Sequence, residues 1–394
     1  MLLLVLLAAA HASPPLPPIN GMNYIRLNGS QANGASVYHS TFSPRLANQT
    51  HDALALQAMA GFGFDAVRVF IDVGAEDRDD GVAGSYNSSA LLSAEYMGNV
   101  AAFVTTAAQH GLRTMVTLQG LAVSAAWQAA AGPWPADVHG LNTLYLAPGY
   151  VKAKAEYVRL FLGALQQRLG SQNLSSSLLA VSLDNEITLV DNLPPFTLDT
   201  NVTTADGVTY DMAQLASRQQ AADANIVFAL NTWAAAVRDV CAECRVTAGM
   251  YTFLAVGKSG PNGLKPNTSP DPRWPPRPAS LSAYSNLDYL DLHIYPSSAP
   301  SWSLAKDMAS EEWPSVDLAR TPVVMCEFGA FRSFYPTIQE ATAAMLSLRA
   351  NVLSQYNVSG SMLWTWDTYE QPRLWYATAS NDALASALAP QAAQ

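Results

Sequence analysis

Short apolar runs recur along the 394-residue chain, and longer amphipathic or polar stretches separate them. Each run is apolar almost throughout, so both faces of the strand it predicts are expected to be buried, as in a parallel sheet covered by helices. The eight predicted strands are Ile19–Tyr24, Ala66–Ile71, Arg113–Leu118, Leu178–Leu183, Arg245–Met250, Tyr289–His293, Val323–Glu327 and Ser361–Trp364.

The stretches between these runs have helical periodicity. Apolar residues at i, i+3, i+4, i+7 and i+11 begin at Val158, and Gly170 then supplies a C-terminal stop. Thr337 and Glu340 form a capping-box pattern after Pro336. Further helices are expected over Asp52–Ala60, Ala94–Gln109, Asp211–Val240 and Leu304–Leu318. Strands alternating with helices predict an α/β fold, a (β/α)8 barrel formed by one domain over residues 19–394.

Two long connections, Ile187–Tyr210 and Thr252–Asn286, follow predicted strands. Barrels build their active sites from loops on that side, so we interpret both as walls of a binding cleft; variable surface insertion is the alternative. Five tryptophans in or near such loops are either packed anchors or stacking platforms for sugars: Trp127, Trp134, Trp274, Trp302 and Trp375.

Composition narrows the function classes. Hydrophobic residues make up 49% of the chain and charged residues 13%, which favours a large core over disorder. The net charge of −10 argues against nucleic-acid binding, which needs a basic surface. A neutral substrate is compatible with this charge.

The N-terminus indicates export. Residues 1–12, MLLLVLLAAAHA, form an apolar run with a small-x-small ending, which predicts a signal peptide; a hydrophobic N-terminal arm is the alternative. The run is too short to span a bilayer, and no other segment qualifies. N-x-S/T sequons add to the expectation of a secreted, extracellular glycoprotein, at Asn28, Asn48, Asn87, Asn173, Asn201, Asn267 and Asn357.

Three cysteines are too few for a disulfide scaffold. Cys241 and Cys244 form a redox or metal pair, a local disulfide or two packed thiols, and no second pair completes a zinc site. Cys326 adjoins Glu327 on a predicted strand, so its side chain is expected to face away from the barrel mouth, into the helix layer.

Two glutamates stand where apolar runs end. Glu186 closes LLAVSLDNE and Glu327 closes TPVVMCE, after the fourth and seventh predicted strands. A closed ring of eight strands brings these positions to opposite sides of one mouth. Two facing carboxyl groups are what cleavage of an acetal requires, because one protonates the leaving oxygen while the other attacks or activates water.

The ordered set of strand-end residues resembles retaining glycosidases of clan A, most nearly glycoside hydrolase family 5, over about residues 19–370. The matching segments are Asp184-Asn185-Glu186, Leu292-His293-Ile294-Tyr295, Glu327-Phe328-Gly329, Trp364 in SMLWTWD, and Arg68 in AVRVF. The chain departs from the family at Gln119, where a histidine often follows strand three, and at Ile187, where proline is common.

The resemblance implies that Glu186 is the acid/base and Glu327 the nucleophile. Arg68 and Tyr295 would then hold Glu327, and Asn185 would hold the sugar 2-hydroxyl. His293 would bond the acid/base side, Trp364 would lie under the cleaved sugar, and Gln119 would contact sugar without changing charge. Glu186 is expected to keep its proton near neutral pH through burial and the negative charge of Glu327.

This reading predicts a monomer that needs no cofactor or metal and cleaves a β-linked polysaccharide or oligosaccharide, either β-mannan or β-glucan. One alternative is a non-catalytic carbohydrate-binding barrel. Another alternative is a metal-dependent hydrolase. That chemistry needs several histidine and aspartate ligands at strand ends, and His293 is the only histidine at the end of a predicted strand. Arg68 could also be a buried ion-pair partner of Asp65 or Asp72.

Overall fold

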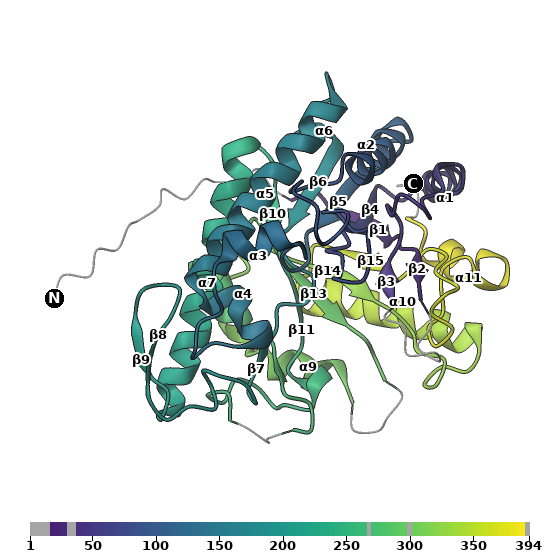
Figure 1. Ribbon diagram of the computed structural model, residues 1–394. Coiled ribbons are helices and arrows are strands. Elements are labelled where there is room, and N and C mark those ends of the chain that lie inside the picture. Colours follow the sequence, from purple (N-terminus) through teal and green to yellow (C-terminus); the bar gives the residue numbers. More distant parts are fainter. Residues whose placement is uncertain (1–15, 30–36, 266–268, 298–301, 391–394) are drawn as a thin grey trace.

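Parallel strands form a barrel at the centre of the molecule (Figure 1). The computed structural model describes residues 16–29, 37–265, 269–297 and 302–390. Neighbouring strands follow the order β10-β6-β5-β4-β1-β15-β14-β13-β11. Their bounds are β1 Ile19–Asn23, β4 Ala66–Phe70, β5 Arg113–Thr117, β6 Leu178–Ser182, β10 Val246–Thr247, β11 Gly249–Tyr251, β13 Leu290–Ile294, β14 Val323–Phe328 and β15 Gly360–Leu363.

The fifth predicted strand is divided in two. β10 pairs with β6, whereas β11 pairs with β13, and Ala248 alone separates the two halves. Because consecutive residues pair with strands on either side, the chain itself closes the ring. The (β/α)8 barrel expected from the sequence is therefore confirmed.

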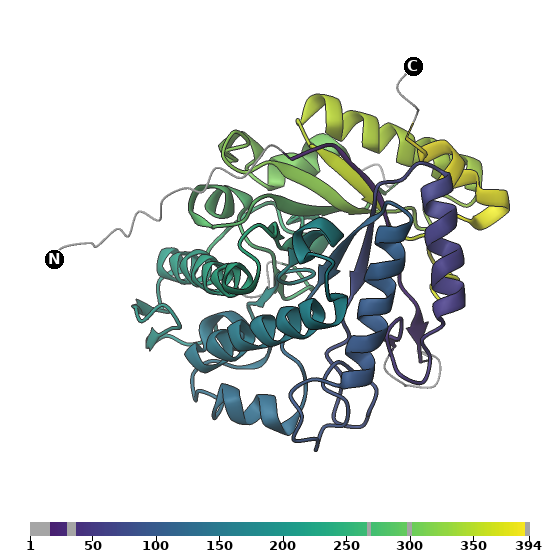
Figure 2. The ribbon, with the colours of Figure 1, turned by 90° about the horizontal axis from the view of Figure 1, so that it is seen from above.

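Helices surround the strands on the outside (Figure 2). The main helices are α1 Gln49–Gly61, α2 Ala94–Gln109, α5 Pro148–Leu169, α7 Leu215–Val240, α10 Ile338–Gln355 and α11 Ala379–Leu388. Shorter helices are α3 Ala125–Ala131, α4 Thr143–Leu146, α6 Leu174–Ser177, α8 Pro278–Tyr284 and α9 Leu304–Ser310. The apolar face predicted from Val158 is buried, α5 stops at Gly170 with φ +62°, and the capping box of α10 is present.

Side chains from β1, β4, β5, β6, β14 and β15, with the residue just before β13, pack together and form an inner core. Its members are Ile19, Ala66, Met115, Leu179, Ala180, Tyr289, Val324, Cys326 and Met362. Cys326 therefore faces the barrel interior, and its predicted orientation into the helix layer is wrong. The register of β14 shifts between Met325 and Phe328, which lets Cys326 and the adjacent Glu327 both point inward.

The two long connections are joined to each other beside the barrel mouth. β7 (Leu189–Val190) in the first pairs antiparallel with β12 (Arg273–Trp274) in the second. β8 (Asn201–Thr203) and β9 (Thr209–Asp211) form a hairpin, as do β2 (Leu27–Asn28) and β3 (Tyr38–His39). Trp127 and Trp274 are buried loop anchors, whereas Trp134 is 58% exposed.

A disulfide joins Cys241 and Cys244 where α7 ends, which settles the alternatives left open for this pair. The predicted signal peptide and the sequon at Asn267 lie outside the described residues. Within the described ranges, we find no helix with both the length and the apolar character needed to cross a membrane.

Candidate active site

The carboxyl-terminal ends of the parallel strands meet at one mouth and bring the predicted site residues together. Glu186 lies just after β6, His293 on β13 and Glu327 on β14. Arg68 reaches the same point from β4, and Tyr295 follows β13 directly. These residues are far apart in the sequence, and the order of strands around the barrel places their strand ends side by side.

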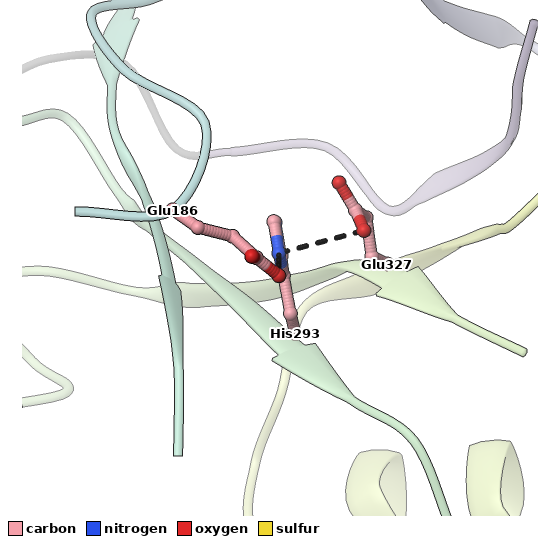
Figure 3. A group of neighbouring side chains, drawn as sticks. All are labelled: Glu186, His293 and Glu327. Carbon is pink, nitrogen blue, oxygen red and sulfur yellow. Dashed lines mark hydrogen bonds and ion pairs between the residues drawn. The ribbon is translucent and has the colours of Figure 1, made fainter. Parts of the chain in front are cut away.

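Glu186 and Glu327 approach His293 from either side (Figure 3). His293 Nδ1 lies 3.2 Å from Glu186 Oε1 and 3.5 Å from Glu327 Oε2. One oxygen of each glutamate and a ring nitrogen of His293 all lie within 4.8 Å of one another. The Glu186 side chain is 33% exposed and that of Glu327 only 4%, so Glu186 is the carboxyl group that solvent and a ligand can reach.

The contacts expected around Glu327 are present. An Arg68 guanidinium N–H donates to Glu327 Oε1, and the Tyr295 hydroxyl donates to Oε2 at 2.9 Å. Both oxygens of this buried carboxyl group are therefore bonded, and its position is fixed.

Arg68 is held by a polar shell of its own. Its guanidinium donates to Asn185 Oδ1 at 2.8 Å, to Asn23 Oδ1 at 3.2 Å and to Thr117 Oγ1 at 3.1 Å. Asp291 Oδ2 lies 3.4 Å from Arg68 Nη2.

The alternative partners considered for Arg68 are engaged elsewhere. Asp65 pairs with Arg113 at 3.8 Å, and Asp72 pairs with Arg78 at 2.6 Å. Arg68 thus belongs to the site and not to a separate buried ion pair.

Sequence reasoning missed Asn23, Thr117 and Asp291. Asp291 is fully buried and lies 3.2 Å from His293 Nε2, opposite the ring nitrogen that faces the two glutamates. A charged residue inside the apolar run YLDLH, two positions before His293 and so on the same strand face, was the available signal. Asn23 and Thr117 end their strands and gave no comparable signal.

The pKa shift of Glu186 differs from the sequence-based expectation. Burial raises the pKa of Glu186, but the hydrogen bond and charge of His293 outweigh burial, so the net shift is downward. The net pKa shift of Glu327 is upward, because burial and the charge of Glu186 outweigh the opposing positive charges of His293 and Arg68.

The surroundings of His293 favour the proton on its imidazole, whereas the sequence-based expectation placed it on Glu186. Burial lowers the pKa of His293, but the carboxylates of Glu327 and Asp291 and the hydrogen bonds to Asp291 and Glu186 outweigh it and raise the pKa to about 10. The expectation placed His293 beside the acid/base but did not include the effect of its charge on the two carboxyl groups.

The last two predicted site residues, Trp364 and Gln119, differ in how far they are buried and bonded. Trp364 is 8% exposed, packs against the Phe70 ring at 5.3 Å and donates from Nε1 to Gln371 Oε1 at 2.7 Å. Gln119 lies exposed just beyond β5, and its side chain makes no hydrogen bond within the described chain. Trp364 is therefore part of the packed site, and Gln119 stands at the rim.

Hydrogen bonds to the Asp184 carboxylate fix the loop that carries Asn185 and Glu186. Asp184 Oδ1 accepts from the N–H of Gly120 at 3.2 Å and of Asn185 at 2.9 Å, and the Tyr145 hydroxyl donates to Oδ2. Gly249 on β11 packs under this loop so closely that a Cβ there would lie 1.7 Å from the Asn185 carbonyl oxygen.

Glu186, His293 and Glu327 are the one group in the described residues whose spacing could accommodate a metal ion. Arg68 and Tyr295 already donate to both oxygens of Glu327. The guanidinium charge beside Glu327 also disfavours a cation. The donor set therefore fits proton chemistry better than metal binding.

No protein-family profile matches the sequence, and no curated protein sequence matches it. Among solved structures, the endo-1,4-β-mannanase of Rhizomucor miehei has a TM-score of 0.64 at 13% identity, over 95% of this chain and 97% of that chain. The glycoside hydrolase family 5 mannosidase of the same organism has a TM-score of 0.51 at 12% identity, over 96% of this chain and 92% of that chain.

A third similar structure is the exo-β-1,4-mannosidase of Opitutaceae bacterium strain TAV5, with a TM-score of 0.52 at 19% identity over 91% of this chain. This chain spans about half of that longer protein, 53% of its length. The chain therefore shares the fold of these mannanases and mannosidases, one of which is a member of glycoside hydrolase family 5.

Proposed function

We propose that this chain is a retaining glycoside hydrolase of family 5, cleaving a β-linked polysaccharide or oligosaccharide, β-mannan or β-glucan, by double displacement. The observation that carries the proposal is the approach of a Glu186 oxygen and a Glu327 oxygen to within 4.8 Å. Carboxyl groups roughly 5–5.5 Å apart suit attack by one of them, whereas roughly 6.5–9.5 Å leaves room for a water and inversion.

In the first step, Glu327 attacks the anomeric carbon of the sugar. A bond forms between that carbon and a Glu327 oxygen, the bond to the leaving oxygen breaks, and a proton passes from Glu186 to that oxygen. The donors on Glu327 from Arg68 and Tyr295 fit a fixed, ionised nucleophile. The greater exposure of Glu186 fits a group that must meet the leaving group.

In the second step, a water molecule attacks the anomeric carbon and gives a proton to Glu186. Glu327 leaves as the carboxylate, and the sugar keeps its original configuration. Because Asn185 Oδ1 is occupied by Arg68, the Asn185 amide N–H groups remain to donate to the sugar 2-hydroxyl. Trp364 supplies an apolar surface for the ring.

The acid proton is held jointly by Glu186 and His293. The raised pKa of His293 favours the proton on the imidazole, whose Nδ1 is 3.2 Å from Glu186. A bound sugar excludes water from Glu186, which raises the cost of its charge and moves the proton onto the carboxyl group. Secretion belongs to the proposal as well, on the strength of the apolar leader and the sequons.

Replacement of Glu327 tests the assignment of the nucleophile. Glu327→Ala is expected to lower kcat on an activated aryl β-glycoside by at least about a thousandfold, since no covalent intermediate can form. Added azide should restore cleavage and give the glycosyl azide of inverted configuration, identified by nuclear magnetic resonance.

Glu156→Ala, an exposed glutamate on α5, is the matched control and should keep full activity. An active Glu327→Ala protein without azide would contradict the assignment. Tight binding of polysaccharide by the unaltered chain without release of reducing ends would favour a non-catalytic binding protein.

A further inference from the structure

A hollow of about 660 Å³ lies beside the candidate active site. Its lining comes from the loops after β14 and β15: Phe331, Arg332, Ser333, Phe334, Pro372 and Arg373. Ligand sites in proteins usually have volumes of about 300–1,000 Å³, so the hollow can hold a small molecule or a sugar unit.

Backbone contacts between the two loops fix the shape of this hollow. Phe331 and Leu374 form an isolated antiparallel bridge, and the Arg332 N–H donates to the Arg373 carbonyl at 2.9 Å. The Trp375 indole N–H donates to the Tyr335 carbonyl at 2.7 Å. The walls are therefore preformed, which lowers the cost of binding a ligand.

The hollow adjoins the catalytic carboxyl groups through two aromatic rings. The ring of Phe331 lies 5.6 Å from that of Tyr295, and the Tyr295 hydroxyl donates to Glu327. Leu374, in the bridge to Phe331, packs in the same cluster as Trp364. A glycan seated over Trp364 can therefore extend its next unit into the hollow.

Two arginines give the hollow its chemical character. Arg332 stacks over Trp375 with its guanidinium carbon 4.0 Å from the ring centroid, and its Nε donates to the Leu374 carbonyl. Arg373 is exposed. Neither arginine has a carboxylate partner within ion-pair distance in the described part of the chain, so no acidic side chain there neutralises the charge that they bring to the hollow.

Arg332 and Arg373 come from two loops joined by a backbone hydrogen bond, so two positive charges border one hollow in a chain of net charge −10. Stacking on Trp375 orients Arg332 and leaves its terminal N–H groups to donate. A planar guanidinium matches carboxylate and similar oxyanions with two parallel hydrogen bonds. Phe331 and Phe334 add apolar faces of the kind on which sugar rings pack.

We propose that this hollow is a subsite for an anionic sugar unit, one that carries a carboxylate or a sulfate ester and adjoins the sugar that is cleaved. The subsite would make the chain prefer acidic β-glycans over neutral ones of the same backbone. It rests on the proposed function, because its place in the substrate is defined by the cleavage point.

The test measures binding and turnover separately. Soluble β-mannan and β-glucan are each prepared in three forms: neutral, oxidised at C6 to the carboxylate, and sulfated. Binding is measured by calorimetry and cleavage by release of reducing ends. On the better backbone, the unaltered chain should bind one of the two anionic forms about tenfold more tightly than the neutral form at low salt, and added salt should reduce the difference.

The Arg332→Gln/Arg373→Gln variant should bring the ratio of anionic to neutral binding to near one. Arg373→Gln alone should also lower the ratio. Because Arg373 is exposed, this single variant is expected to fold normally, so it separates loss of anion binding from misfolding of the double variant. Arg168→Gln, at the exposed end of α5, is the matched control and should leave the ratio unchanged. Whether the oxidised or the sulfated form gains affinity identifies the anion.

Equal binding of all three forms, or a preference that survives in the double variant, would overturn the subsite. Cleavage without any preference for the anionic form would reject the subsite and leave the hydrolase intact. Arginine-dependent anion preference without cleavage would reject the hydrolase and leave the hollow as an anion-binding site.

Discussion

His293 is the residue that most changes the electrostatics of the site. It lies between two carboxyl groups and has Asp291 behind it, and these three carboxyl groups favour the protonated imidazole. Asp291 and Arg68 are both fully buried, and together with Glu327 they form a chain of alternating charges. Removing one member leaves another buried charge unpaired, which is costly.

Replacing His293 tests the shared proton. The raised pKa of His293, about 10, should keep the alkaline limb of kcat/KM well above neutral pH. In His293→Gln, Glu186 must hold the proton alone, and the limb should move to lower pH by at least about one unit. The pH profile of kcat/KM on an aryl glycoside measures this shift.

His110→Gln is the matched control for that profile, because His110 lies at the end of α2, away from the strand ends that form the mouth. Its profile should coincide with that of the unaltered chain. An unchanged alkaline limb in His293→Gln would mean that His293 does not share the proton.

Glu311, which lies outside the candidate active site, should make the stability of the fold depend on pH. Burial raises its pKa to about 8, against the opposing hydrogen bonds from the Phe253 N–H and Ser310. Between pH 4.5 and 8 the folded chain keeps this proton while the unfolded chain loses it, so stability falls as pH rises through that window. Glu311→Gln should therefore gain about 1 kcal/mol or more, relative to the unaltered chain, between pH 5 and pH 8.

Urea unfolding at the two pH values measures this difference, with the exposed Glu156→Gln as control. Equal pH dependence of stability in Glu311→Gln and the unaltered chain would show that Glu311 ionises normally in the folded state.

At the scale of elements, β11 supports the loop that carries Glu186. A Cβ at Gly249 would lie 1.7 Å from the Asn185 carbonyl oxygen and 3.1 Å from His293 Nε2, so Gly249→Ala must displace the loop or the histidine. Displacement of this size should lower kcat/KM by about a hundredfold, because catalytic groups tolerate little misplacement.

Gly163→Ala, on α5, is the control for backbone flexibility, since its added Cβ meets nothing within 4 Å. It should keep full activity and stability. Full activity in Gly249→Ala would show that the loop adjusts without affecting the site.

The same elements show what periodicity could and could not predict. Continuous apolar runs predicted all the barrel strands, and α2 has the bounds expected for it. The split of the fifth strand at Ala248 was not predicted, although Gly249 directly after the break is a residue that often marks an irregularity in a strand. The orientation of Cys326 failed for a related reason, since strict alternation does not hold across a register shift.

At the scale of the whole molecule, ring closure made the candidate site predictable. Residues at the ends of the second, fourth, sixth and seventh predicted strands must share one mouth, so Arg68, Glu186, His293 and Glu327 could be grouped from sequence. Side-chain hydrogen bonding could not be predicted in this way. Asn23 and Thr117 became visible only through their contacts with Arg68.

The loops that would choose a substrate are long and irregular, and the sequence indicated only their place. Pairing of β7 with β12 ties the two long connections together on one side of the mouth. The loops after β14 and β15 enclose the hollow on another side. Specificity is therefore determined around the ring, by side chains whose positions depend on loop conformation.

The most direct test of the double-displacement proposal is to trap the sugar on the enzyme. A 2-deoxy-2-fluoro-β-mannosyl or β-glucosyl fluoride slows both steps but leaves a good leaving group, so the covalent intermediate accumulates. Peptide mass spectrometry after inactivation should find one added sugar on the peptide that contains Glu327, and none in Glu327→Ala. Attachment of the sugar to another residue, or turnover of ordinary substrate with inversion of configuration, would contradict the account.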